Sequence, residues 1–441
     1  MTMKDTRTPW PEDRAVTACD GELSGATLTE PSRRIPVVGD YDVCVLGGSC
    51  TGVFAAVRAA QTGARVALVE KQNAFGGVAA SGLVNVWHKL RDNTDTQQII
   101  GGLTEAVVDR LGQIGGVDRD ANGVFSLNTE ELKIELDRLV LEHEITPYLH
   151  TVYAAPNMID GRVAAVYIEN KDGRQAIRAK TFVDATGDGD LARDVGLPYA
   201  IRDGLQPPTT CANIAGLPDA ISGLIATHRD EFDLAPDHGW GRLIPGTPGV
   251  RMCAFTHVFN TLASDATALT AAEIEGRRQI RAYMDIARKY GDRQNEPALL
   301  NLSSYIGVRE TRSFTANYTL TEEDVMTGKR FPDAIANGTY PIDVHDPQTG
   351  KFKFKRLTCD FYQIPLSTML SNRAENIVLA GRIISADRSA FGAIRVMVNL
   401  NQVGEAAGVT AALAAGSGMP ISDLDAGAVR NQLLTLGAKV V

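Results

Sequence analysis

Residues 41–70 constrain the fold more strongly than any other part of the chain. They open with the apolar run YDVCVL, which is typical of a strand buried on both faces of a parallel sheet. A glycine-rich turn over residues 47–52 follows, then small apolar residues at helical spacing, and then a second apolar run, RVALVE. Strand, turn, helix and strand in this order predict a βαβ unit, and therefore an α/β protein built on a parallel sheet.

The turn in this unit has the composition of a dinucleotide-binding turn, with a plain α/β turn as the alternative. Gly47 and Gly52 stand where a tight bend and a close helix–strand contact are needed, but Ser49 replaces the middle glycine of the G-x-G-x-x-G pattern. The helix that follows directs free amide groups and its positive dipole end at one point, which favours a diphosphate. Glu70 ends the second strand, where an acid binds ribose hydroxyls. We expect cofactor contacts from Gly47, Gly48, Ser49, Cys50, Thr51, Gly52, Glu70 and Lys71.

Length and charge limit the function classes. The 441 residues suffice for two or three domains, and the net charge of −9, without a basic cluster, disfavours binding to nucleic acid and to anionic membranes. No apolar stretch is long enough to span a membrane, and the first residues do not resemble a signal peptide. The six cysteines contain no C-x-x-C pair and the histidines have no metal-ligand spacing. We therefore expect reduced thiols, no metal and a cytoplasmic location.

The pattern along the chain predicts four parts. They are an N-terminal arm (1–34), the first part of a nucleotide-binding domain (35–200), an inserted mixed α+β domain (201–355) and the return of the first domain (356–441). Helices are expected at 129–143, capped by Asn128, and at 271–290, opened by Thr270 with Glu273 and closed by Gly291. A long alanine-rich helix is expected at about 394–415, and a β-rich stretch surrounds the hairpin signal at 171–173.

Four blocks together give the chain a resemblance to FAD-dependent oxidoreductases with the glutathione-reductase-like FAD fold. They are residues 41–70, 75–84 (FGGVAASGLV), 182–192 (FVDATGDGDLA) and 376–408. The resemblance implies an FAD/NAD(P)-binding Rossmann-like domain with three layers, a parallel sheet plus a β-meander, and an inserted substrate domain. It also implies FAD rather than NAD, a choice that the residues alone leave open.

The resemblance further implies three groups of cofactor contacts. The implied residues are Gly76, Gly77, Ala80, Ser81 and Gly82 in one loop, Ala185, Thr186, Gly187 and Asp188 in a turn, and Gly381, Arg382, Asp387, Gly392 and Ile394 near the last helix. Two of these groups have a simpler interpretation as well: the first as an ordinary loop, and Asp188 with Asp190 as solvated turn or cap residues. Such folds place a Gly-Asp pair before the last helix, whereas this chain has Ala386-Asp387, so the assignment of Asp387 to the ribityl chain departs from the pattern.

Candidates for the chemistry are His88, His257, Arg309, Tyr362 and Arg395. His88 directly follows the first cofactor loop, and His257 lies on a probable strand of the inserted domain. Arg309, with Arg312, matches the family and would clamp an anionic or polyhydroxyl substrate. The alternatives are a surface or core position for each histidine and ion pairing with acids such as Glu310 for the arginines.

We therefore expect an FAD-dependent oxidoreductase that transfers a hydride between a small polar organic substrate and flavin N5. An NAD(P)H-dependent flavin reductase or monooxygenase-like enzyme is the second interpretation, which the missing second glycine fingerprint disfavours. A flavoprotein that acts on RNA is the third, and it would require a basic face that the sequence does not suggest.

Overall fold

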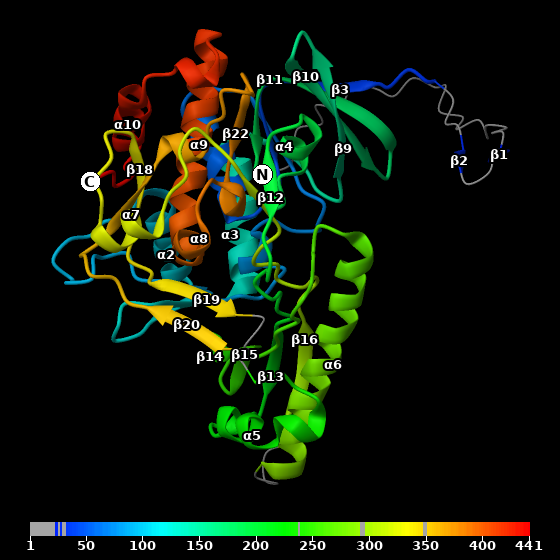
Figure 1. Ribbon diagram of the computed structural model, residues 1–441, viewed down its shortest axis with the longest axis vertical. Coiled ribbons are helices and arrows are strands. Elements are labelled where there is room, and N and C mark those ends of the chain that lie inside the picture. Colours follow the sequence, from blue (N-terminus) through cyan, green and yellow to red (C-terminus); the bar gives the residue numbers. More distant parts are fainter. Residues whose placement is uncertain (1–22, 25–26, 29–31, 237–238, 292–295, 347–350) are drawn as a thin grey trace.

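The computed structural model describes residues 23–24, 27–28, 32–236, 239–291, 296–346 and 351–441. Most of the predicted N-terminal arm lies outside these ranges. Two lobes are visible in Figure 1: a larger one around a central sheet, and a smaller one that extends below it and carries the long helix α6 (Ala266–Tyr290).

A seven-stranded sheet forms the centre of the larger lobe. Its strands, in spatial order, are β8 (Thr146–Tyr148), β4 (Val66–Val69), β3 (Val37–Leu46), β11 (Gly173–Asp184), β10 (Arg162–Asn170) and β9 (Val152–Ile159), with β22 (Ile377–Leu379) paired to the end of β11. The β8, β4, β3, β11 and β22 pairings are parallel, whereas β11, β10 and β9 form an antiparallel meander. The predicted parallel sheet with a β-meander is confirmed.

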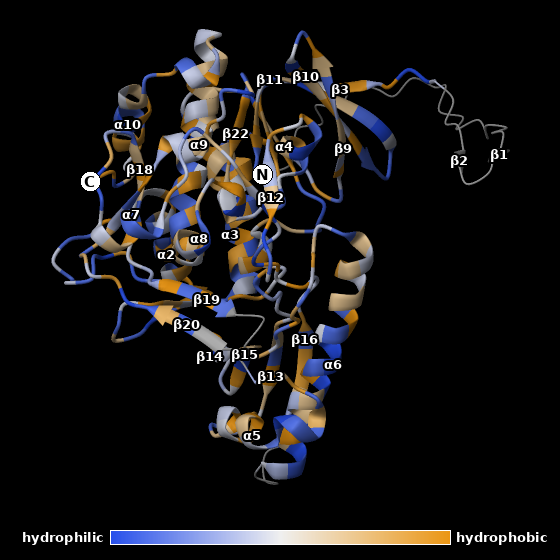
Figure 2. Ribbon diagram, viewed as in Figure 1, coloured by the Kyte–Doolittle hydropathy of each residue, from blue (hydrophilic) through white to orange (hydrophobic). Residues whose placement is uncertain are grey.

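Both faces of the central strands are buried, which explains their continuous apolar runs. Val43 and Val45 of β3 point into a core shared with α1 (Cys50–Gln61), α3 (Thr129–Glu142) and α9 (Met397–Ser417). Cys44 and Leu46 point into a second core under the β9–β10 ribbon and α4 (Asp190–Asp194). Helices, sheet and ribbon thus make three layers, and Figure 2 shows apolar residues concentrated in the strands between them.

The smaller lobe has its own antiparallel sheet. Its order is β14 (Trp240–Leu243), β15 (Val250–Ala254), β13 (Ala212–Ala215) and β16 (Ala298–Leu302), and α5 (Ile221–His228) and α6 cover one face. The remaining elements are β1 (Leu23–Ser24), β2 (Thr27–Leu28), β5 (Val86–Trp87), α2 (Gly102–Gln113), β6 (Val117–Arg119), β7 (Phe125–Leu127), β12 (Tyr199–Ile201), β17 (Arg312–Phe314), α7 (Glu322–Thr327), β18 (Ala334–Gly338), β19 (Ile342–Asp346), β20 (Lys351–Lys355), β21 (Tyr362–Pro365), α8 (Arg388–Ile394), α10 (Ala426–Thr435), and the short 3₁₀ turns η1 (Gly77–Ala79), η2 (Arg229–Phe232), η3 (Leu366–Thr368), η4 (Gly381–Ile383) and η5 (Ile421–Asp423). No helix within the described ranges is long and apolar enough to cross a bilayer.

The division of the chain at residues 200 and 355 stays a prediction. The core of the smaller lobe draws its buried residues from positions 212–287. Strand β18, from the predicted insertion, pairs with β21, from the predicted return of the first domain, so hydrogen bonds cross the expected boundary at 355.

Two predicted helices have other bounds in the structure. Helix α6 begins at Ala266 rather than at residue 271, because the Asp265 side chain caps it by accepting from Ala268 N. The Thr270 hydroxyl instead donates to the Ala266 carbonyl inside the helix, while Gly291 ends it as predicted. The expected helix at 394–415 is interrupted at Val396, whose extended backbone separates α8 from α9. The cap of α3 by Asn128 is confirmed.

Helices α1 and α9 touch at backbone distance. A Cβ on Gly404 would lie 2.2 Å from the Thr51 carbonyl oxygen, and one on Gly408 would lie 2.0 Å from that of Ala55. Beside this contact the Arg58 guanidinium pairs with the buried Glu405 carboxylate. The small residues of α9 therefore set how closely this helix approaches α1.

We expect Gly408→Ala to lower the free energy of unfolding by about 2–3 kcal/mol, because the added methyl group would overlap the backbone of α1. Gly416→Ala is the matched control: Gly416 lies in the same helix, exposed, with nothing within 4 Å of its added Cβ. It should be neutral or stabilising by up to about 1 kcal/mol, since alanine favours a helix. Thermal unfolding followed by circular dichroism checks both, and equal effects would contradict the contact.

Candidate functional site

A cavity lies where the ends of the central strands meet the smaller lobe. The larger lobe contributes the turn after β3, the end of β4, the loop at 76–78, the turn after β11, and Gly381 with Arg382. Arg395 and the first turns of α9 complete the part of the cavity wall that the larger lobe forms. The smaller lobe closes the cavity with Ala263, Leu269, Glu273, Tyr305, Ile306 and Val308. The cavity is therefore shared by segments far apart in the sequence.

Many of the predicted cofactor residues line this cavity. They are Gly47, Ser49, Cys50, Thr51, Glu70, Lys71, Gly76, Gly77, Ala185, Thr186, Gly187, Asp188, Gly381 and Arg382. Of the remaining ones, Gly48, Gly52, Ala80, Ser81, Gly82, Asp387, Gly392 and Ile394 do not line it. Their involvement with the cofactor stays a prediction, and the structure gives several of them packing roles.

The turn after β3 is shaped by backbone contacts. Gly47 has φ +99°, and a Cβ there would lie 2.2 Å from the Ala185 carbonyl oxygen. A Cβ on Gly52 would lie 1.8 Å from the Gly47 carbonyl oxygen, so the start of α1 rests directly on the turn. The N-cap residue Ser49 makes no side-chain cap hydrogen bond. The first amides of α1 thus face the cavity without a protein side chain capping them, as an anion site requires.

Glu70 is tied to the same turn. Its Oε2 accepts from Gly48 N at 2.6 Å, and its Oε1 accepts from Gln72 N at 2.8 Å. The two amides orient the carboxylate at the cavity wall. Each oxygen keeps a further lone pair, which is compatible with the predicted contact to ribose hydroxyls.

The opposite wall carries buried polar atoms that have no partner among the described residues. They are both side-chain polar atoms of Asn401, on α9, and Nη1 of Arg382. Asn401 is only 1% exposed. Nη2 of Arg382 reaches Asp188 at 3.3 Å. Buried polar groups normally find partners, so this wall is built for a polar ligand. Asn401 escaped the sequence reasoning because an amide inside an apolar helix gives no motif.

Asp387 caps a helix in the structure, and its predicted contact with the ribityl chain stays a prediction. Its Oδ1 accepts from Ala390 N, which caps α8, and its Oδ2 accepts from Glu322 N. Gly392 lies inside α8, where a Cβ would be 2.6 Å from the Asp343 carbonyl oxygen. The N-terminal turns of α9, through Met397, Leu400 and Asn401, line the cavity instead.

A second cluster adjoins the cavity through Arg395. Asp343 is at its centre. Its Oδ2 accepts from the Tyr340 hydroxyl at 2.7 Å and lies 3.3 Å from Arg395 Nη2. Its Oδ1 lies 3.6 Å from His345 Nε2. Asp343 and His345 share one face of β19, because Ile342 and Val344 point into the core. Although Asp343 is buried, the charges of Arg395 and His345 keep its pKa below the usual range.

The smaller lobe extends this cluster. The His257 ring lies 4.6 Å from that of His345, and His257 Nε2 is 3.3 Å from Arg309 Nη2. The Gln206 side-chain oxygen accepts from Arg395 Nη2 at 3.1 Å, whereas Gln206 Nε2 and Arg395 Nε have no described partner. Three predicted residues, His257, Arg309 and Arg395, are thus brought together. The sequence patterns did not single out Asp343, His345 and Tyr340, because these residues lie outside the recognised blocks.

Tyr362 is not part of either group, and the structure gives no support to the predicted catalytic role. It is fully buried on β21, where its hydroxyl donates to the Ala393 carbonyl and accepts from Asn399 Nδ2. One hydrogen bond joins β21 to α8 and the other joins β21 to α9. The Tyr362 side chain therefore holds these two helices against the strand.

His88 packs against Tyr340 with tilted rings whose centroids are 4.3 Å apart. It does not line the cavity. Burial lowers the pKa of His88 to about 4, an effect that Asp343 opposes and the charges of Arg242 and Arg395 reinforce. The imidazole is therefore neutral at physiological pH.

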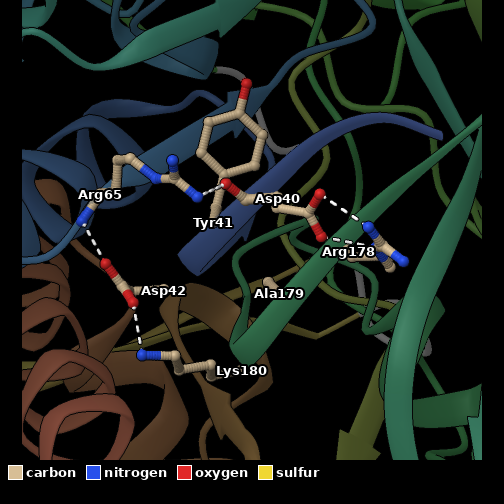
Figure 3. A pocket seen from close by; sticks show the side chains of 7 residues that line it. All are labelled: Asp40, Tyr41, Asp42, Arg65, Arg178, Ala179 and Lys180. Carbon is tan, nitrogen blue, oxygen red and sulfur yellow. Dashed lines mark hydrogen bonds and ion pairs between the residues drawn. The ribbon is translucent and has the colours of Figure 1, made fainter.

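A separate hollow opens at the other end of β3 (Figure 3). Its walls carry paired charges: Arg178 with Asp40, and Lys180 with Asp42, which also accepts from Arg65 N. The hydrogen bond from Arg178 lowers the pKa of Asp40. These exposed ion pairs join the neighbouring strands β3 and β11, and each contributes little to the free energy of unfolding.

The chain belongs to the FAD dependent oxidoreductase family, whose model matches residues 42–433. The cofactor is FAD, and the cavity residues fit it. The uncapped start of α1 suits its diphosphate, the carboxylate of Glu70 suits its ribose, and the unpartnered groups of Asn401 and Arg382 suit its polar edges.

Curated relatives match only part of the chain. A dihydrolipoyl dehydrogenase of Trypanosoma brucei brucei is 28% identical over 166 residues, which cover 35% of this chain and 32% of that protein. A mitochondrial dihydrolipoyl dehydrogenase of Schizosaccharomyces pombe is 24% identical over 162 residues, covering 34% and 28%. The matches therefore span less than a third of the relatives' own length.

Similar solved structures cover most of the chain at low identity. One is a geranylgeranyl bacteriochlorophyll reductase-like protein of Thermoplasma acidophilum, with 10% identity, a TM-score of 0.46, and coverage of 90% of this chain and 83% of that chain. Another is a p-nitrophenol 4-monooxygenase of Pseudomonas putida, with 12% identity, a TM-score of 0.44, and coverage of 89% and 84%.

We expect Gly47→Ala to abolish FAD retention, because the added methyl group would collide with the Ala185 carbonyl and distort the amide-rich turn. Gly63→Ala is the control, since Gly63 has a similar φ of +94° but nothing within 4 Å of its added Cβ. Both variants carry the same backbone strain of about 1–2 kcal/mol. The flavin-to-protein absorbance ratio after purification measures retention, and loss of flavin from both variants would contradict the explanation.

We expect His88→Gln to flatten the pH dependence of stability between pH 4 and 6.5. The folded pKa is lowered to about 4, so only the unfolded chain binds a proton at His88 in this window, and the native protein loses stability as pH falls. The slope from this single group is at most about 1.4 kcal/mol per pH unit. Urea unfolding at several pH values measures it, with the exposed His150→Gln as control; identical slopes for His88→Gln and wild type would refute the assignment.

Proposed function

We propose that this protein is an FAD-dependent dehydrogenase or reductase of a small, polar, anionic organic substrate. The observation that carries the proposal is the cluster around Asp343, which adjoins the cofactor cavity through Arg395. When bound, FAD supplies two-electron chemistry by accepting or giving a hydride at flavin N5. The protein's contribution is to bind and orient the substrate and to handle its proton.

The hydrogen-bonding character of the cluster supports an anionic substrate. Its side chains are mostly donors: the guanidinium groups of Arg309 and Arg395, the amide of Gln206 and the imidazole rings of His257 and His345. Nε of Arg395 and Nε2 of Gln206 have no described acceptor, and leaving buried donors unpaired is costly. A carboxylate offers the acceptors that this group lacks, and it pairs well with guanidinium geometry.

The pair His345 and Asp343 is suited to proton transfer. The carboxylate lies 3.6 Å from His345 Nε2, so it stabilises the imidazolium that forms when His345 takes a proton. Tyr340 and Arg395 hold the carboxylate from its other oxygen. We therefore assign proton transfer to His345, oriented by Asp343, and substrate binding to Arg395 with Arg309 and His257.

The NAD(P)H-dependent alternative has less support. The smaller lobe, as far as the structure describes it, is built on an antiparallel sheet and offers no second strand–glycine turn–helix unit for a nicotinamide cofactor. Direct reduction by a small substrate therefore agrees better with this architecture.

An anaerobic screen tests the proposal. Small hydroxy and amino acids are mixed with the holoenzyme, and loss of the yellow flavin absorbance is followed against matched neutral alcohols, amines and amides. Bleaching by a carboxylate but not by its amide supports the proposal. Rapid bleaching by NADPH, with none by any carboxylate, would favour the alternative instead.

We expect Asp343→Asn to slow bleaching by the identified substrate by about 100-fold or more, because His345 loses the charge that supports its protonated form. The pH optimum of bleaching should also move, which a purely structural change would not produce. Asp219→Asn, a fully exposed carboxylate paired with Arg251, is the control and should react as wild type. An unaltered rate in Asp343→Asn with bound FAD would refute the assignment.

A further inference from the structure

One segment of the smaller lobe reaches across to the cofactor turn. Ser304 N donates to the Ser81 carbonyl at 2.8 Å in the larger lobe, and Ile306 N donates to Glu273 Oε1 at 2.6 Å on α6. Gly307 exchanges backbone hydrogen bonds with Thr209. Tyr305 stands between these anchors, so both lobes determine its position.

The side chain of Tyr305 enters the cavity beside the amide-rich turn. A Cβ built on Gly77 would lie 2.6 Å from Ser49 Cβ and 3.6 Å from the Tyr305 hydroxyl oxygen. Ser49 is the N-cap of α1, where the free amides suit a diphosphate. The hydroxyl is therefore within a few ångströms of the place that the diphosphate needs.

The electrostatic surroundings keep this hydroxyl a hydrogen-bond donor. Burial and the nearby carboxylate of Glu70 raise the pKa of Tyr305, and the opposing effect of Arg382 is smaller. No described protein acceptor takes its proton, whereas the hydroxyl of Tyr153 in the same cavity donates to Asp194. A neutral donor beside an anion site gains its acceptor when the anion binds.

We propose that Tyr305 donates a hydrogen bond to the diphosphate of bound FAD. The smaller lobe then belongs to the cofactor site as well as to the substrate site, and bound FAD holds the two lobes together. The proposal concerns cofactor binding alone and stands whether or not the proposed substrate class is correct.

The test compares holoenzymes of wild type, Tyr305→Phe and Tyr167→Phe. The last variant loses a hydroxyl that accepts from Asn157 on the β9–β10 ribbon, away from the cavity. Release of FAD after dilution is followed by flavin fluorescence, and the diphosphate is observed by phosphorus NMR of the holoenzyme. We expect about tenfold faster release from Tyr305→Phe, as for loss of one hydrogen bond to a charged group, and a shifted diphosphate resonance. Tyr167→Phe should match wild type in both.

Two results would overturn the proposal. One is an unchanged release rate in Tyr305→Phe. The other is faster release with an unmoved diphosphate resonance, because Tyr305 would then act through packing rather than through the phosphates. Circular dichroism of the holoenzymes verifies that the phenylalanine variant is folded.

Discussion

The cofactor site depends on backbone contacts that leave no room for a side chain. Gly52 rests on the Gly47 carbonyl, and Gly47 rests on the Ala185 carbonyl at the end of β11. These contacts hold the start of α1 against two parallel strands, so free amides, Glu70 and the turn after β11 open at one edge of the sheet. Strands buried on both faces make that edge rigid, which allows backbone groups to hold part of a ligand.

The same rigidity brings the cofactor cavity close to the proposed substrate site. Helix α9 approaches α1 closely through Gly404 and Gly408, and its break from α8 at Val396 puts Arg395 at the cavity wall. Arg395 also pairs with Asp343 on β19. Arg395 therefore connects the cofactor cavity with the proposed substrate site, and the smaller lobe contributes residues to each of them, Tyr305 to the cavity and His257 to the proposed site.

Local features were predictable where one residue decides the outcome. Asn128 caps α3 and Gly291 ends α6 as expected, because capping depends on neighbouring backbone groups. The start of α6 was placed wrongly because Asp265 and Thr270 both suit a cap. The structure selects Asp265, and the added turn lets Leu269 pack beside Ile306 at the cavity. The spacing of Asp387 suits both a ligand contact and a helix cap, and the structure shows the cap of α8.

The sequence by itself determines the parallel sheet, the amide-rich turn and the dinucleotide class of ligand. It does so because residues close together in the chain impose strand burial and glycine conformation. Only the tertiary structure decided that Asp343 and His345 join His257 and Arg395, that Asn401 faces the cofactor cavity, and that Tyr362 is a packing residue. Most of these contacts join positions that are tens of residues apart, such as Asp343 and Arg395 at 52 and Tyr362 and Ala393 at 31, or they depend on which face of a helix is buried. They follow from how the lobes dock, which no local pattern of residue types encodes.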